Sequence, residues 1–309
     1  MRSTDTTTRG GVVVGVTGPG RETAALKFAA ECAARERAEV VLVHAYGTAL
    51  PPPPPSVLMT YAEAADIAEW VVKGVEEEFA ELADGTVEFR TAAVVGMPAH
   101  TLVELSRGAR LVVVQHRDAH WLGRLFVGST VNGAAAHSEC PVISVPAGWE
   151  PGRPRRVVVG VHEGGSPREA VTAGLEWAAA TGASLQVVHA WRLDPAYDDI
   201  ITSRVAGDWQ EERARALKSA ISDLRAAHPS VPVGVEVHHQ WAAQALVDES
   251  ETASMLVLGR HAGHWRGAPH LGSVARTVLR EARSPVMIVP LVKPADDWDF
   301  DAEDVSPQT

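Results

Sequence analysis

Short runs of valine, isoleucine and leucine recur along the chain, and alanine-rich stretches with helical periodicity separate them. The apolar runs lie at 12–16, 40–43, 87–95, 111–114, 142–145, 157–161, 185–188, 231–237, 255–258 and 286–289. Runs without polar alternation are typical of strands buried on both faces, as in a parallel sheet. The helical stretches lie at 22–37, 60–83, 99–107, 129–138, 168–181, 207–227, 243–252 and 273–282. Alternating strands and helices predict an open α/β fold with helices on both faces of the sheet.

The chain also repeats itself at a separation of 144 or 145 residues. Four motifs occur twice, namely VVVGV at 12–16 and 157–161, VHA at 43–45 and 188–190, Gly-Ser at 128–129 and 272–273, and CPVISVP at 140–146 with SPVMIVP at 284–290. A period of this length indicates two copies of a whole domain rather than a solenoid. We therefore predict two tandem doubly wound sheets of five parallel strands each.

The domain boundaries follow from composition. We predict a first domain at 11–148, a linker at 149–156 that contains two prolines and a glycine, and a second domain at 157–293. Residues 1–10 and 294–309 are expected to be disordered. The C-terminal tail has six acidic residues and no basic one, so it repels itself and lacks apolar surface to bury.

Charge and composition exclude several classes of function. The formal net charge is −11, and no basic stripe is available for nucleic acid or an anionic membrane surface. No apolar run approaches the roughly 20 residues that a membrane helix needs. The two cysteines, Cys32 and Cys140, form no CxxC motif and fit small core positions in a reduced, cytoplasmic protein.

Ligands of open parallel sheets bind beyond the carboxyl ends of the strands. Two pairs of segments lie there: the turns after the opening strands, 17–20 and 162–166, and the segments after the fourth strands, 115–130 and 259–274. The latter two both contain a Gly-Ser pair that opens a helix, where N–H groups and the helix dipole favour a phosphate. The second of them contains two arginines and three histidines and no acid, namely Arg260, His261, His264, Arg266 and His270. The alternative is that Ser129 and Ser273 are plain helix N-caps.

Other chemistry finds little support in the sequence. His261, His264 and His270 have no cysteine or paired carboxylate beside them, so we assign no metal ligands. His238-His239 is expected to be structural or solvent-facing. No Ser-His-Asp set, nucleophile elbow or Walker A motif is present, so no enzymatic activity is predicted. Trp70 and Trp177 are expected to pack on the sheet.

The repeated motifs, together with G-x-P-A-x-x-L at 96–102, resemble the universal stress protein family in its tandem form, over residues 11–291. The resemblance implies sheets of strand order 3-2-1-4-5 and a pairing of the two domains through their last strands. It also implies, for many members, ATP bound between the first and fourth strands, whereas other members bind no nucleotide. A homodimer is left open.

The family's site residues transfer better to the second half than to the first. The acid after the first strand falls on Thr17 in the first half and His162 in the second, and the adenine-side backbone position on Ala45 and Ala190. The first loop glycine falls on Gln115 and Gly259, and the second on Asp118 and Ala262, with Gly263 following. The resemblance thus places a nucleotide among residues of the second half, namely His162, Ala190, Gly259, His261, Ala262, Gly263, Gly272, Ser273 and Val274. The first half keeps only Gly128 and Ser129 and is predicted to be degenerate.

The function implied by the resemblance is an ATP-binding regulatory module of stress adaptation, with Mg²⁺ as a candidate companion of the phosphates. Two rivals remain: a nucleotide-free scaffold of the same fold and a slow ATP hydrolase, which would need Mg²⁺ to neutralise phosphate charge.

Overall fold

The computed structural model describes residues 10–47, 61–116, 129–152, 155–162, 166–193, 195–260 and 271–290. The two ends predicted to be disordered lie outside these residues, except for Gly10. Four predicted site residues also lie outside them, namely Gly128, His261, Ala262 and Gly263.

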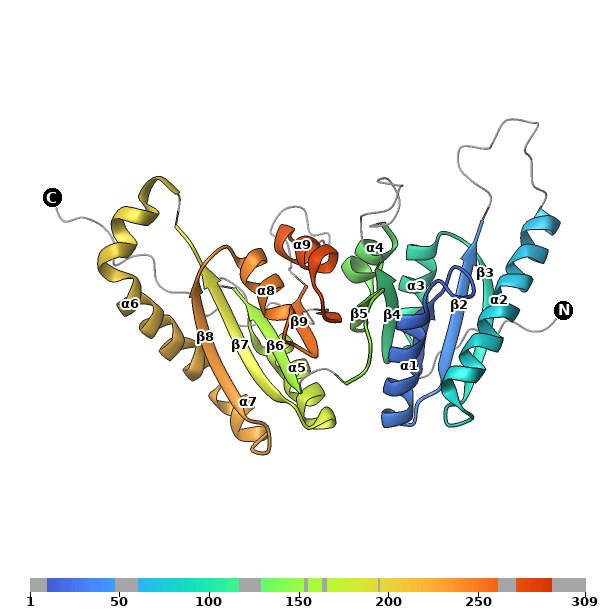
Figure 1. Cartoon of the computed structure of the whole chain (residues 1–309), viewed down its shortest axis with the longest axis horizontal. Coiled ribbons are helices and arrows are strands. Elements are labelled where there is room, and N and C mark those ends of the chain that lie inside the picture. Colours follow the sequence, from blue (N-terminus) through green and yellow to red (C-terminus); the bar gives the residue numbers. More distant parts are fainter. Residues whose placement is uncertain are drawn as a thin grey trace.

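The first half alternates strands and helices as the apolar pattern predicts (Figure 1). Its strands are β1 (Val12–Gly15), β2 (Val40–Tyr46), β3 (Phe89–Val95), β4 (Leu111–His116) and β5 (Val142–Pro146). Its helices are α1 (Thr23–Glu36), α2 (Tyr61–Ala83), α3 (Pro98–Ser106) and α4 (Ser129–His137). The helix boundaries lie within one residue of those predicted.

The second half repeats this order. Its strands are β6 (Arg156–Val161), β7 (Ser184–Trp191), β8 (Val233–His239), β9 (Met255–Gly259) and β10 (Val286–Val289). Its helices are α5 (Arg168–Thr181), α6 (Pro195–Ala220), α7 (Ser222–Ala227), α8 (Ala242–Ser250) and α9 (Ser273–Glu281). The predicted helix at 207–227 is divided into α6 and α7, and α6 begins twelve residues earlier than the sequence indicates.

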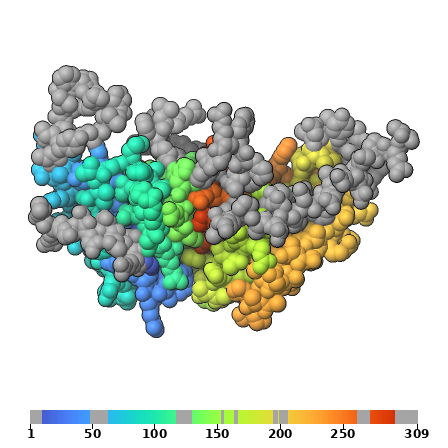
Figure 2. Space-filling model, turned by 180° about the vertical axis from the view of Figure 1, so that it is seen from behind, coloured from blue at the N-terminus to red at the C-terminus, as the bar shows by residue number. Residues whose placement is uncertain are grey.

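Both halves have the strand order 3-2-1-4-5, but their sheets are not separate. They form one ten-stranded sheet of order β3-β2-β1-β4-β5-β10-β9-β6-β7-β8. All neighbouring strands are parallel except β5 and β10, which pair antiparallel with Ile143 opposite Met287. The last strands of the two halves therefore meet edge to edge, as the resemblance implies. In Figure 2, green atoms of the first half touch red atoms of the second half.

The hydrophobic cores are continuous across this junction. One cluster lies between the sheet and α1, α2 and α5, and a second lies on the other face beneath α3, α4, α8 and α9. Each cluster contains buried residues of both halves. The helices of each half thus cover a shared sheet, which holds the carboxyl ends of its strands in fixed positions.

Aromatic side chains bridge the two halves on the α1 and α5 face. Phe28 stacks on Trp177 with ring centroids 5.9 Å apart and meets Trp149 edge-on at 5.2 Å. The Arg35 guanidinium lies 4.4 Å from the centre of the Trp177 ring. Trp177 therefore packs as predicted, and Trp149 in the predicted linker is buried. The prediction for Trp70 is wrong, since this side chain is 68% exposed on the outer face of α2.

Candidate functional site

The structure brings three predicted site residues of the second half to one edge of the sheet. β6 lies between β9 and β7, so the carboxyl ends of these three strands are adjacent. His162 follows β6 directly, Ala190 lies near the end of β7, and Gly259 ends β9. The register places Val161 opposite His189, one residue before Ala190. These positions surround the crevice in which an open α/β sheet binds its ligands.

The VHA motif fixes the shape of this edge in both halves. His189 Nδ1 lies 3.2 Å from the carbonyl oxygen of Val161, and His44 Nδ1 lies 3.0 Å from that of Val16. Since a carbonyl only accepts, the proton of each bond belongs to Nδ1. Each imidazole thereby connects the second strand to the end of the first, at Val161 of β6 and at Val16, directly after β1.

The glycine of the VVVGV motif has a packing role. A Cβ at Gly160 would come within 2.6 Å of Leu258 Cδ2 and 2.8 Å of Leu246 Cδ2. At Gly15 the nearest atom would be Leu102 Cδ1 at 3.2 Å. The missing side chain lets α8 and α3 approach the sheet closely, so this glycine of the repeat contacts the core rather than a ligand.

The N-terminus of α9 begins at a glycine. Gly272 is the N-cap in an extended conformation, with φ −62° and ψ 164°, and makes no side-chain capping bond. Ser273 is the first helical residue and is exposed, so the N-cap role considered for it belongs to Gly272. Among the residues that the structure describes, none has an atom within 4 Å of a Cβ built on Gly272. The first N–H groups of α9 have no partner within the helix, which is the arrangement that binds anions. Unlike the exposed Ser273, Val274 packs its side chain against the core beneath α9.

Arg260 does not serve the N-terminus of α9, although the sequence suggested it as a cation for an anion site. Its Nη1 donates a hydrogen bond to the Ser138 carbonyl oxygen of the first half at 2.7 Å. Burial lowers the pKa of this guanidinium, and its backbone N–H pairs with Val289 O at 2.7 Å. The side chain that follows β9 therefore connects the second half to the C-terminal end of α4.

In the first half, the carboxylate of Glu22 lies beside Thr17, the position at which the family's acid is missing. Glu22 is 5% exposed and accepts hydrogen bonds from Thr17 Oγ1 at 2.6 Å, Thr17 N at 2.9 Å and Gly18 N at 3.4 Å. Thr17 stands at the family's acidic position, and the role of Glu22 was not predicted from the sequence. The available signal was an acid seven residues after the end of β1, at the N-cap position of α1.

Gln115 fills the first-half crevice between β4 and α1. Its Nε2 donates to the Arg21 carbonyl oxygen at 2.8 Å, and its Oε1 accepts from Ala25 N at 3.2 Å. The equivalent position of the second half is Gly259, which has no side chain to place there. The two crevices therefore differ at the position of the first loop glycine.

A second carboxylate, that of Glu78, accepts hydrogen bonds from the same turn of the first half. Glu78 of α2 accepts hydrogen bonds from Gly20 N at 2.7 Å and Thr23 Oγ1 at 2.5 Å. Together with Glu22 it places two negative charges against the backbone N–H groups of this turn. Like charges repel, so this turn disfavours a phosphate.

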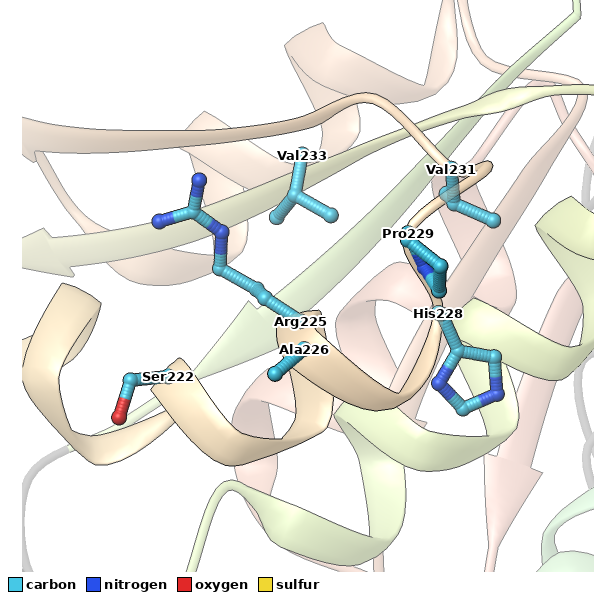
Figure 3. Close-up of a pocket in the computed structure, with 7 residues that line it drawn as sticks. All are labelled: Ser222, Arg225, Ala226, His228, Pro229, Val231 and Val233. Atoms are coloured by element: carbon cyan, nitrogen blue, oxygen red, sulfur yellow. The ribbon is translucent and has the colours of Figure 1, made fainter.

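A separate hollow lies at the opposite end of the sheet, where β8 begins (Figure 3). Its volume is about 360 Å³, and it is lined by residues of α7 and of the segment leading into β8, namely Ser222, Arg225, Ala226, His228, Pro229, Val231 and Val233. Figure 3 shows Arg225 extending beneath Val233 while the His228 ring points away from both. Ligand sites require polar groups that converge, so we assign none here.

The comparisons with known proteins agree with this architecture. The model of the universal stress protein family matches residues 9–146 and 154–290. The chain belongs to the universal stress protein family. Because the match occurs twice, the chain is a tandem universal stress protein. Among the described helices, none has the length and hydrophobicity of a membrane-spanning segment.

Relatives in this family match over most of their length. A universal stress protein of Mycolicibacterium smegmatis is 29% identical over 290 residues, which cover 90% of this chain and 96% of the relative. One of Mycobacterium tuberculosis is 28% identical over 293 residues, covering 90% and 95%. The crystal structure of a universal stress protein from Archaeoglobus fulgidus superposes with a TM-score of 0.67 at 15% identity, covering 90% of this chain and 98% of the other. This last likeness shows the fold alone.

Proposed function

We propose that this tandem universal stress protein is a regulatory module that binds one adenine nucleotide, ATP by the family resemblance, in its second half. The nucleotide would lie across the carboxyl ends of β6, β7 and β9, with its phosphates at the N-terminus of α9. Occupancy of this site would then bias the contacts of the module with partners in stress adaptation.

The observation that supports this most is the difference between the two crevices. In the first half, Gln115 occupies the space beside α1 and two carboxylates hold the neighbouring turn. In the second half, Gly259 has no side chain at the equivalent position, and no described atom lies within 4 Å of a Cβ built on Gly272, which opens α9. Gly272 and the backbone N–H groups of Ser273 and Val274 would hold the phosphates.

The expected affinity is modest. A charge-assisted hydrogen bond contributes about 1.5–3 kcal/mol, and the second half lacks the family's acid because His162 stands in its place. That loss corresponds to roughly 10- to 100-fold in the dissociation constant. Mg²⁺ would neutralise phosphate charge, since the guanidinium of Arg260 is engaged with Ser138.

We propose a binding module rather than an enzyme. Cys32 and Cys140 are both buried and unbridged, which supports a reducing compartment such as the cytoplasm. A scaffold role is favoured for the first half alone, because its own side chains occupy its crevice.

Isothermal titration calorimetry with MgATP tests the site. Gly272→Val fits the described backbone, since φ −62° suits valine and a Cβ there meets no atom of the described residues. We expect one site in the wild type and at least about tenfold weaker binding in this variant, from the loss of one charge-assisted contact. The matched control is Gly128→Val in the first half, which should leave the affinity unchanged.

Two results would change the proposal. Equal affinity of Gly272→Val and the wild type would remove the nucleotide from the second half. Steady phosphate release that is lost in Gly272→Val would instead indicate a slow ATP hydrolase.

A further inference from the structure

Three side chains with metal-binding atoms meet where α8 covers the edge strand β8. Glu236 and His238 are two residues apart on β8, so they lie on the same face of the sheet. Glu249 comes from the last turn of α8. One ligand atom of each lies within 4.8 Å of the others. The nitrogen is imidazole Nε2, and the other two atoms are carboxylate oxygens.

The contacts of His238 are unlike those of a hydrogen-bonded histidine in the same strand. Its Nε2 lies 3.4 Å from Glu236 Oε2 and 3.4 Å from Glu249 Oε1. This nitrogen is buried and makes no hydrogen bond within the described part of the chain. The next residue, His239, makes a hydrogen bond of 2.8 Å to Asp198. Because Nε2 of His238 lies beyond good hydrogen-bonding distance from both carboxylates, an ion has room between the nitrogen and the two oxygens.

The separations fit a tetrahedral metal ion. Zn²⁺ binds imidazole nitrogen and carboxylate oxygen at about 2.0–2.2 Å, so neighbouring ligand atoms of a tetrahedron are about 3.4 Å apart. Both nitrogen-to-oxygen distances of His238 have this value. Glu236 is 49% exposed, so its side chain is free to rotate and close the remaining oxygen-to-oxygen separation.

Glu249 is held in place by a partner outside the cluster. Arg156 Nη2 donates to Glu249 Oε2 at 2.6 Å, while its Nη1 contacts Thr252 Oγ1 at 3.1 Å. The other oxygen, Oε1, remains directed at His238. Hydrogen bonds of this kind orient ligating carboxylates in metal sites. The two carboxylates and Arg156 together bear one net negative charge before a cation binds.

The first half shows that the fold does not need polar residues here. The positions equivalent to Glu236, His238 and Glu249 are Ala92, Val94 and Leu105, 144 residues earlier. Ala92 and Leu105 are buried, and Val94 packs against the core beneath α3. The second half has therefore replaced an apolar contact between strand and helix by three potential ligands, which costs core packing unless something compensates.

We propose that Glu236, His238 and Glu249 form a Zn²⁺ site that joins α8 to β8, with solvent at the fourth position. Two carboxylates and one imidazole suit a borderline cation with nitrogen and oxygen ligands. The site belongs to the second half only, and it does not depend on nucleotide binding.

Zinc titration of the full chain after removal of metals with EDTA tests the proposal, by calorimetry and by mass spectrometry under native conditions. The wild type should bind one Zn²⁺ at this site and melt at a higher temperature with Zn²⁺ than with EDTA. His238→Val, which installs the first-half residue, should lose that ion and the thermal shift. Co²⁺ in place of Zn²⁺ should give the strong visible bands of four-coordination in the wild type only.

Two further variants make the test decisive. Glu236→Ala changes a half-exposed residue, so it keeps the fold, and it should weaken zinc binding at least about tenfold, as for a lost charge-assisted contact. The double variant His264→Ala/His270→Ala removes other imidazoles and should retain the ion. Zinc binding that survives in both His238→Val and Glu236→Ala, or that disappears in the double variant, overturns the proposal. Absence of a bound ion at micromolar Zn²⁺ also overturns it.

Discussion

Phe28 of the first half packs against Trp177 of the second half. We expect that truncating this side chain makes the two halves unfold in separate transitions. The ring is 4% exposed and contacts Trp149 and Trp177 at centroid distances of 5.2 and 5.9 Å. Truncation of a buried phenylalanine to alanine costs about 3–5 kcal/mol. Aromatic pairs contribute about 0.5–1.5 kcal/mol each within such a total, so up to about 3 kcal/mol of the loss concerns contacts with the two tryptophans.

Equilibrium unfolding in urea, followed by tryptophan fluorescence and by far-ultraviolet circular dichroism, measures this effect. The wild type should show coincident transitions, because both cores span the two halves. Phe28→Ala should lower the midpoint and separate the two transitions, since a packed contact between the halves is lost.

Phe79→Ala is the matched control. Phe79 is fully buried within the first half and meets Phe89 at 4.9 Å. Its truncation should cost a similar free energy while the two probes remain coincident. If both variants keep coincident transitions and equal midpoints, Phe28 does not couple the halves and the reasoning fails.

Three further predictions concern packing and ionisation. Gly160→Ala should destabilise by about 1–3 kcal/mol in urea, because its Cβ would meet a leucine atom at 2.6 Å, whereas Gly148→Ala meets nothing; equal effects would contradict this. Burial raises the pKa of Cys32 to about 12, so its thiol should resist Ellman's reagent at about pH 8 until the protein is denatured, and rapid labelling of the folded chain would refute this. Burial raises the pKa of Asp198, but hydrogen bonds from His239, a backbone N–H and an arginine outweigh it and hold this pKa below its usual value. The stabilisation is therefore present above the ordinary carboxyl pKa and is lost as the pH falls below about 4, so the difference in Tm between wild type and Asp198→Asn should shrink there. If the Tm difference between wild type and Asp198→Asn does not change with pH, the Asp198 carboxylate does not stabilise the fold in the way described.

Much of the fold was predictable because its buried strands have unbroken apolar sequences. The runs at 12–16 and 255–258 matched β1 and β9 to within one residue. The start of α6 was missed, since residues 195–206 mix acidic, hydroxyl and apolar residues without a clear helical period. Asp198, nearly fully buried, accepts from Leu193 N and Arg192 there. Asp198 also bonds to His239 of β8, 41 residues later in the sequence, a contact that helical periodicity does not predict.

The candidate site was only partly predictable. Motif spacing located Gly259 and Gly272 at the edge of the crevice, because glycines and the ends of strands follow the repeat. Motif spacing did not show that the Arg260 side chain donates a hydrogen bond to the Ser138 carbonyl oxygen. It also did not show that the Glu22 carboxylate lies beside Thr17. Those outcomes depend on how side chains turn at the ends of helices, which periodicity does not record.

We infer that the nucleotide binds in the second half because Gly259 has no side chain at the position that Gln115 occupies in the first half. Equilibrium dialysis with radiolabelled ATP, on wild type, Gly259→Gln and Gln115→Gly, tests it most directly. We predict one nucleotide per chain in the wild type and in Gln115→Gly, where the carboxylates of Glu22 and Glu78 remain. Gly259→Gln, which copies the first-half residue, should bind none. Undiminished binding by Gly259→Gln, or two nucleotides per wild-type chain, would contradict the account.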